Sequence, residues 1–451
     1  MGGIIMSRHD RAMERLDALL AGFAAQEPLP GLAVGIVAPD GVFARGYGIR
    51  DAGTGEPVDE HTLFHLASVS KPLVATAVMQ LAEQGRLNLD APASDCVPYF
   101  KLADGREREV TIRDLLSHTS GMPDEEDFQW DSPEDDEGSL ERYVRALAAR
   151  SLDRNPGEEH AYSNIGFELL GDVIAKVSGM SFEAYMREHV LRPAGMEEST
   201  FLLAEVPASQ LAAPHILGVP EGRYGPQKSL VFPYHRAHGP SSTLYMNAVD
   251  SCRLMLAYLK PEQAAEGKGL LEEGSQGEMW GTRVGLGYGD WLDGIALGWF
   301  TGAYQGRRAV SHTGQDTGFR SYLVLLPEAG LGVTLMMNGD YVGLKVLMKG
   351  ILDLLLGEGT GEVQRNLAHY LTGIALSGGI DAAWDEYRQI LHDGVERYAV
   401  SADDFSYIAY PLEENGYAGE ALQVLELGLR LFPESEHLRE RLRDSVQKMN
   451  P

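Results

Sequence analysis

Two groups of strand-like segments, far apart in the chain, constrain the fold more than any other feature. Residues 32–37 and 42–47 read as a hairpin around a Pro-Asp-Gly turn, after a predicted helix at residues 10–24. Residues 87–259 then read mainly as helices and loops. Strand signals return at four later segments: 295–304, 309–312, 321–326 and 332–337. One mostly antiparallel sheet must therefore join both groups, with helices on both faces.

This arrangement predicts an α/β fold of the α+β type with a helical insert at about residues 87–259. A cleft between the sheet and the insert is a usual place for a concave site. We therefore expect the functional residues of residues 1–356 to lie there.

The chain changes character after residue 356. The glycine-rich stretch 357–361 is a linker signal, and almost everything beyond it reads as helix. Residues 416–433 resemble half of a tetratricopeptide repeat. Such arrays need about three repeats to bury their faces. We therefore expect residues 357–451 to be an all-α tail that docks onto the first region, and it could also support a homodimer.

The stretch Ser68-Val69-Ser70-Lys71 places a hydroxyl and an amine three residues apart. Proline at position 72 suits the first turn of a helix, and apolar residues follow at helical spacing. A helix start offers an N–H group and the positive end of the macrodipole to an oxyanion. Lys71 can activate Ser68 as a nucleophile only if its ammonium is kept partly deprotonated.

Tyr162-Ser163-Asn164 follows a loop signal and precedes an apolar run at helical spacing, so it is predicted to open another helix. A phenol beside a lysine ammonium is pushed toward its anionic form, which would make Tyr162 a base. Asn164 can hydrogen-bond both Lys71 and a substrate amide. A half-buried tyrosine beside a polar loop residue is the structural alternative.

His312-Thr313-Gly314 lies between two strand-like segments, and a glycine there permits close approach of a ligand or another backbone. A histidine in such a position is, on its own, more often structural than functional, which is the alternative for His312. The similar sequence His118-Thr119-Ser120-Gly121 follows a helical stretch with a capping box, and we interpret it as structural.

In this order the three segments resemble the active-site motifs of the serine beta-lactamase and penicillin-binding-protein superfamily. Tyrosine in the second motif with histidine in the third is most similar to the class C branch, which includes D-aminopeptidases, D-stereospecific peptidases and family VIII esterases. Residues 64–71, 111–121 and 323–338 resemble the same branch. The resemblance implies a beta-lactamase/transpeptidase-like fold and a serine hydrolase of small esters, amides or short peptides.

The resemblance also implies residue roles. Ser68 would be the acylated nucleophile, Lys71 and Tyr162 its base system, and Asn164 a substrate contact together with the third motif. The backbone N–H groups of Ser68 and Gln315 would form the oxyanion hole, with Gln315 on an edge strand where an extended substrate could lie. Which of Lys71 and Tyr162 takes the first proton stays open.

One departure from the resemblance bears on the substrate. Penicillin-recognising members usually carry lysine where His312 stands, and that cation helps to hold the substrate carboxylate. A neutral imidazole holds it less well, which favours esters, amides or peptides that lack the carboxylate. Beta-lactamase or D,D-peptidase activity is the first alternative, and a non-catalytic interaction protein that uses the helical tail is the second.

Composition limits the partners and cofactors. The 451 residues carry 38 basic and 66 acidic side chains, a net charge of −28, which argues against nucleic acid or an anionic membrane as a partner. Two cysteines and no metal-binding motif among 13 histidines predict no disulfide framework, no metal and no cofactor. Charged residues follow the first seven residues directly, so we expect no secretory signal and a cytoplasmic protein. The acidic stretch 124–137 is predicted to be a mobile loop, with a lid as the alternative.

Overall fold

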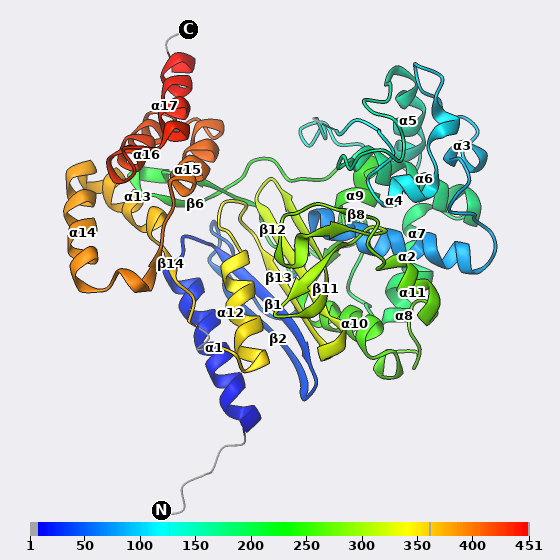
Figure 1. Ribbon diagram of the computed structural model, residues 1–451, viewed down its shortest axis with the longest axis horizontal. Coiled ribbons are helices and arrows are strands. Elements are labelled where there is room, and N and C mark those ends of the chain that lie inside the picture. The colour runs from blue at the N-terminus through cyan, green and yellow to red at the C-terminus, as the bar shows by residue number, and fades with distance from the viewer. Residues whose placement is uncertain (1–7, 126, 360–361, 450–451) are drawn as a thin grey trace, which may run out of the picture.

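The computed structural model describes residues 8–125, 127–359 and 362–449 (Figure 1). Its centre is a nine-stranded sheet with the order β3-β2-β1-β13-β12-β11-β10-β9-β8, in which neighbouring strands run antiparallel. The two strand groups meet where β1 pairs with β13, with Val34 opposite Leu335. This confirms the predicted joining of the two groups. The strands are β1 (Gly31–Ala38), β2 (Gly41–Asp51), β3 (Glu56–Pro57), β8 (Val284–Gly285), β9 (Gly294–Ile295), β10 (Phe300–Tyr304), β11 (Arg307–Asp316), β12 (Phe319–Leu326) and β13 (Leu331–Met337).

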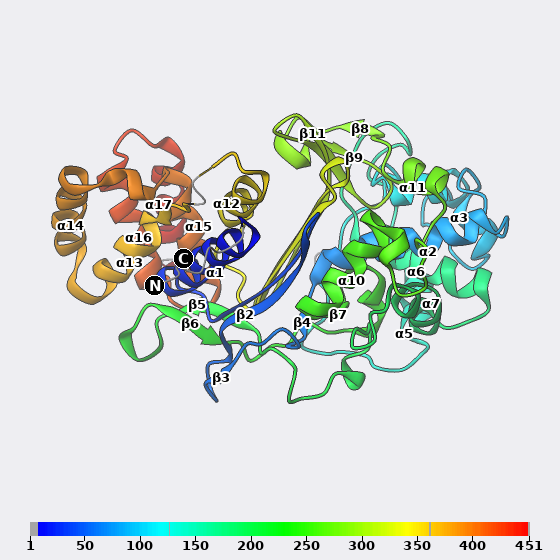
Figure 2. The ribbon, with the colours of Figure 1, turned by 90° about the horizontal axis from the view of Figure 1, so that it is seen from below.

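Helices cover both faces of this sheet, which Figure 2 shows edge-on between them. Neighbouring residues of a strand point to opposite faces, so Val310 and Ala309 of β11 enter two different apolar cores. The core on the Val310 side includes α2 (Ser70–Glu83), α6 (Asn164–Ser178), α10 (Ala248–Leu259) and α11 (Glu273–Met279). The core on the Ala309 side includes α1 (Arg8–Gln26) and α12 (Lys345–Leu356).

The insert at residues 87–259 consists mainly of helices and loops, as predicted, with two short strand pairs. A hairpin of β5 (His215–Gly218) and β6 (Gly225–Lys228) lies within it, and β7 (Tyr245–Met246) pairs with β4 (Phe64–His65) just before the Ser68 segment. The other α-helices of the insert are α3 (Ala93–Cys96), α4 (Ile112–Leu116), α5 (Ser139–Ala146), α7 (Phe182–Met186), α8 (Arg192–Ala194) and α9 (Gly239–Ser242).

The C-terminal region packs onto the Ala309 face of the sheet, as expected for a docked tail. Its helices share one continuous apolar core with the sheet, and the Arg320 guanidinium of β12 donates to the Tyr407 hydroxyl at 2.6 Å. Its elements are β14 (Arg365–Asn366), α13 (Leu367–Gly378), α14 (Ile380–Asp393), β15 (Tyr398–Ala399), α15 (Ala402–Glu414), α16 (Ala418–Leu431) and α17 (Glu436–Met449). The tetratricopeptide likeness stays a prediction, and linker positions 360–361 lie outside the described residues.

The strand predicted at residues 295–304 is in fact two strands. The chain reverses between β9 and β10 in a tight turn, where the Ala296 N–H donates to the Trp299 carbonyl at 2.8 Å. Gly298 has φ +74° in that turn, and a Cβ there would lie 2.5 Å from the Ala75 methyl group of α2. Glycine thus permits both the turn and its contact with α2.

No described helix is both long and apolar enough to cross a bilayer. Residues 1–7, on which the expectation about a secretory signal depends, lie outside the described part of the chain.

Candidate active site

Ser68 lies in a short 3-10 turn (Ala67–Val69) directly before α2, at the predicted helix start. Ala67 has φ +48°, a left-handed conformation that is costly for a residue with a Cβ. The Ser70 hydroxyl stabilises the turn, because it donates to the Ala67 carbonyl at 2.7 Å and accepts from the Leu244 N–H at 3.0 Å. Ser68 itself is partly exposed, so a substrate can reach its hydroxyl.

Strand β11 touches this turn through Gly314. A Cβ at position 314 would lie 2.2 Å from the Leu66 carbonyl oxygen, 2.4 Å from the Ser321 hydroxyl and 3.0 Å from the Ser68 nitrogen. The Ser321 hydroxyl donates to the same Leu66 carbonyl at 2.5 Å. The third predicted motif therefore lies against the first, and only glycine fits at the contact.

Lys71 joins the first motif to the second. Its ammonium is fully buried and donates to the Ser68 hydroxyl at 2.8 Å, the Asn164 side-chain carbonyl at 2.7 Å and the Ser241 backbone carbonyl at 2.9 Å. Burial lowers the pKa of Lys71 to about 8, although the carboxylate of Glu168 opposes this. A minor fraction of Lys71 is therefore neutral at pH 7 and can accept a proton, and this fraction grows as the pH rises toward 8.

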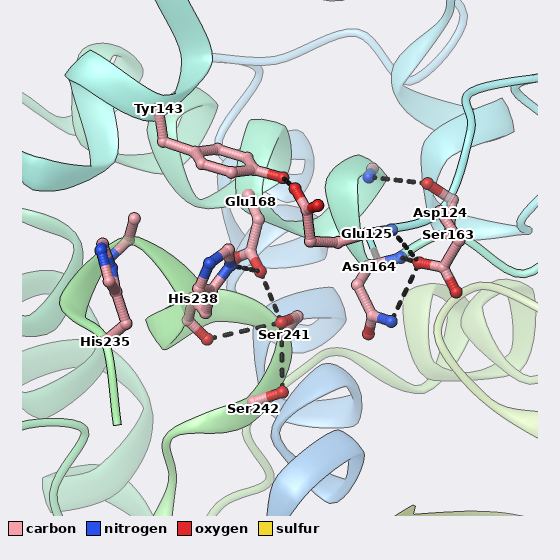
Figure 3. Close-up of polar contacts among 12 residues, drawn as sticks. Asp124, Glu125, Tyr143, Ser163, Asn164, Glu168, His235, His238, Ser241 and Ser242 are labelled. Atoms are coloured by element: carbon pink, nitrogen blue, oxygen red, sulfur yellow. Dashed lines mark hydrogen bonds and ion pairs between the residues drawn. The ribbon is translucent and has the colours of Figure 1, made fainter. Parts of the chain in front are cut away.

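The start of α6 fixes Asn164. Ser163 caps the helix by accepting from the Gly166 N–H at 3.2 Å, and its hydroxyl donates to the Pro123 carbonyl at 2.7 Å. Asp124 accepts from the backbone N–H of Asn164 at 2.7 Å and from its side-chain amide at 3.0 Å (Figure 3). These bonds orient the Asn164 carbonyl toward Lys71, as predicted, and leave one amide hydrogen for a substrate.

Tyr162 lies beside both groups but is not an anionic base. Its ring stacks on His118 with 4.2 Å between the ring centroids, and the Lys71 ammonium lies 5.0 Å from its centre. Burial raises the pKa of the Tyr162 phenol, and a hydrogen bond with Ser68 offsets this only in part. The expectation that Lys71 drives Tyr162 toward phenolate was wrong, because burial and then the nearby carboxylates raise the pKa of the phenol.

His312 is a buried, neutral imidazole. Its Nδ1 lies 2.7 Å from the Thr313 carbonyl oxygen and donates to it, while Thr313 is itself partly exposed. Burial, and then the charge of Lys71, lower the pKa of His312 to about 3. This agrees with the expected lack of a cation at the third motif.

The strand position of Gln315 differs from the expectation. Strand β11 lies inside the sheet, but its pairing with β10 ends where Ser311 faces Phe300. Among the described strands, none pairs with the outer edge of residues 312–316. That edge is open to an extended substrate beside Ser68, although the strand is not a sheet edge over its whole length. The Gln315 side chain is exposed and accepts from Arg320 at 2.5 Å.

Two residues at the start of the acidic stretch 124–137 are hydrogen-bonded to other elements. Asp124 binds Asn164, and Glu125 accepts from the Tyr143 hydroxyl at 2.5 Å (Figure 3). The rings of Phe128 and Trp130 stack on each other at 4.9 Å. Most described residues of this stretch are exposed and lie outside helices and strands, and the mobile loop stays a prediction.

Several residues around the site were missed by sequence reasoning. Ser241 supplies a carbonyl to Lys71, Asp124 orients Asn164, and His118 supports the Tyr162 ring while its Nδ1 accepts from the Ser163 N–H at 3.1 Å. No group of three or more His, Cys, Asp or Glu in the described chain is arranged to hold a metal ion.

Comparison with known proteins identifies relatives. Residues 16–356 match the Beta-lactamase family. Penicillin-binding protein 4 of Amycolatopsis lactamdurans is 30% identical over 339 residues, which cover 73% of this chain and 85% of that protein. Esterase EstB of Burkholderia gladioli is 37% identical over 221 residues, which cover 46% of this chain and 55% of that protein. The octameric penicillin-binding protein homologue from Pyrococcus abyssi superposes with a TM-score of 0.65 at 26% identity, over 80% of each chain.

Proposed function

The chain belongs to the beta-lactamase family, and we propose that this serine hydrolase cleaves small esters or peptide-like amides through an acyl-enzyme on Ser68. The observation that carries the proposal is the hydrogen bonding of Lys71 to both Ser68 and Asn164 at the base of a partly exposed nucleophile. A scaffold without catalysis does not require a buried amine at that point.

The electrostatics favour Lys71 as the first base. Its pKa is lowered to about 8 by burial, whereas the pKa of Tyr162 is raised. Neutral Lys71 takes the Ser68 proton as the oxygen attacks the carbonyl carbon of the substrate. Tyr162, as a neutral phenol beside Ser68, passes a proton to the leaving group as the acyl–leaving-group bond breaks. Water then attacks the acyl carbon and gives a proton to Tyr162, while the bond to Ser68 breaks and the Ser68 oxygen regains its proton from Lys71.

The backbone N–H groups of Ser68 and Gln315 are the proposed oxyanion hole. Gly314 supports this assignment, because its Cα hydrogen takes the place of a Cβ that would lie 3.0 Å from the Ser68 nitrogen. The two amides thus belong to segments in direct contact.

The neutral His312 supports substrates without a carboxylate at the third motif. An imidazole with a pKa of about 3 carries no charge at neutral pH and offers a penicillin carboxylate no ion pair. We therefore place ester or D-amino-acid-type amide hydrolysis first and beta-lactamase or D,D-peptidase activity second. The similarity to an esterase and to a penicillin-binding protein is the reason that both activities remain candidates.

A p-nitrophenyl butyrate assay tests the proposal. We expect turnover by the parent, none by Ser68→Ala, and parental turnover by Ser94→Ala, which removes a buried hydroxyl without a described hydrogen-bond partner. Equal rates for the parent and Ser68→Ala would refute the acyl-Ser68 mechanism.

The substrate class needs a second measurement. Intact-protein mass spectrometry after exposure to activated esters, D-amino amides and penicillins reports which acyl groups remain on Ser68. Nitrocefin turnover as fast as that of a good ester would overturn the argument from His312.

A further inference from the structure

A buried carboxylate, Glu168, lies near enough to Lys71 to act on its charge. Glu168 is on α6, one helical turn after Asn164, so the two side chains project from the same side of the helix. Its exposed fraction is 0%, and the exposed fraction of His238 is 1%. One oxygen of Glu168 accepts from the Ser241 hydroxyl at 2.5 Å and from Nδ1 of His238 at 3.0 Å (Figure 3).

Ser241 connects this carboxylate to Lys71. Its hydroxyl binds Glu168, while its backbone carbonyl accepts from the Lys71 ammonium at 2.9 Å. Ser241 lies in α9, a helix of one turn that follows the turn containing His238. Glu168 therefore fixes the short helix that supplies one of the three hydrogen-bond acceptors of Lys71.

The charge of Glu168 also acts on Lys71 directly. Among the carboxylates that stabilise the Lys71 ammonium, Glu168 has the largest effect, ahead of Asp316 and Asp124. Burial raises the pKa of Glu168, whereas His238, Ser241 and Lys71 stabilise its ionised form. The imidazole thus offsets part of the cost of burying the Glu168 carboxylate.

Other groups face Lys71 but do not share this arrangement. Two imidazoles and two further carboxylates lie near the Lys71 ammonium, and two aromatic rings have their centres about 5 to 6 Å from its nitrogen. These groups are Asp124, Asp316, His118, His312, Tyr162 and Phe167.

Aromatic side chains cover the far side of His238. The rings of Phe128, Trp130 and Tyr143 meet the imidazole edge-on, with centroids 4.9, 5.7 and 5.0 Å away. These rings cover part of the imidazole, and His235 and His238 help to line a neighbouring hollow of about 460 Å³. A carboxylate in such a covered position acts on its neighbours with little screening by salt.

We propose that Glu168 and His238 are positioning residues of the hydrolase reaction: the pair holds the Ser241 carbonyl against Lys71 and sets the pH at which Lys71 gives up its proton. Neither residue touches the reacting atoms. The inference rests on the proposed function for its role in catalysis, but the effect on Lys71 can be measured without turnover.

The test uses charge-removing variants and a control from the same helix. Glu168→Gln keeps the shape and the acceptor oxygen but removes the charge, and His238→Asn removes the imidazole that stabilises the carboxylate. Asp172→Asn is the matched control. Asp172 is one turn further along α6, is 2% exposed, accepts from the Tyr99 hydroxyl at 2.6 Å, and is not among the carboxylates that act on Lys71.

The primary readout is a 13C NMR titration of protein with labelled lysine side chains, in which Lys71→Met identifies the Lys71 signal. We expect the Lys71 midpoint to fall by about half a pH unit or more in Glu168→Gln and in His238→Asn, and to stay at the parental value in Asp172→Asn. In the double variant the Lys71 midpoint should fall no further than in Glu168→Gln alone, because His238 acts on Lys71 through the charge of Glu168, which Glu168→Gln has already removed.

The pH at which kcat/KM for p-nitrophenyl butyrate reaches half of its plateau on the acidic side should fall by the same amount as the NMR midpoint. Unchanged midpoints in both variants would overturn the inference, as would equal falls in the variants and in Asp172→Asn. A parent without esterase activity would instead contradict the proposed function, while the titration would still decide the role of Glu168.

Discussion

Replacing Gly314 by alanine tests whether contact between β11 and the nucleophile turn is required for catalysis. The new methyl carbon would lie 2.2 Å from the Leu66 carbonyl oxygen and 2.4 Å from the Ser321 hydroxyl. Ordinary van der Waals contact needs about 3.5 Å, so the strand or the turn must move by about 1 Å. The Leu66 oxygen is backbone and cannot rotate away, so this movement separates β11 from Ser68.

A displacement of about 1 Å at a reacting group can lower the rate by about 100-fold, and overpacking costs about 1–3 kcal/mol of unfolding free energy. We therefore expect Gly314→Ala to remain folded, with a lower melting temperature and kcat/KM for p-nitrophenyl butyrate reduced by about 100-fold. Gly285→Ala in β8 is the control, because a Cβ there meets no atom within 4 Å among the described residues. Parental kcat/KM in Gly314→Ala would refute the reasoning.

The remaining predictions concern Lys71 and its neighbours. Since burial lowers the pKa of Lys71 to about 8 and only its neutral form can accept the Ser68 proton, kcat/KM for a neutral ester should rise with pH to a plateau with a midpoint near pH 8; a profile flat through neutral and alkaline pH would contradict this. Tyr162→Phe removes the proton donor but keeps the stacked ring, so kcat should fall by about 100-fold or more with little change in melting temperature, and parental kcat would exclude Tyr162 from proton transfer. Asp124→Ala removes the acceptor of two Asn164 hydrogen bonds and should lower the unfolding free energy by about 1 kcal/mol in urea titrations, together with kcat/KM; unchanged values in both measurements would show that Asp124 does not orient Asn164.

Sequence spacing was sufficient for features that depend on neighbouring residues. Ser68 and Lys71 stand one helical turn apart, and the start of α6 at Asn164 follows from local helix signals. The joining of early and late strands followed from the need to bury their apolar faces in one sheet.

Features that depend on distant contacts were not predictable in this way. Glu168 and Ser241 are 73 positions apart and no spacing rule relates them, although they share a hydrogen bond. The ionisation of Tyr162 was predicted with the wrong sign, because the sequence shows the neighbouring amine but not the degree of burial. The composition of residues 124–137 did not indicate the bond from Asn164 to Asp124, because Asn164 belongs to another element.

The shared core beneath the C-terminal helices has a consequence for how the protein can be divided. The family match ends at residue 356, yet Leu367, Phe405 and Leu412 complete the same apolar layer as Val324 of the sheet. A chain that ends at residue 356 would expose that layer to water as a large hydrophobic patch. We therefore expect such a fragment to aggregate on expression. We also expect the full-length enzyme to unfold in one thermal transition, without separate unfolding of the C-terminal helices.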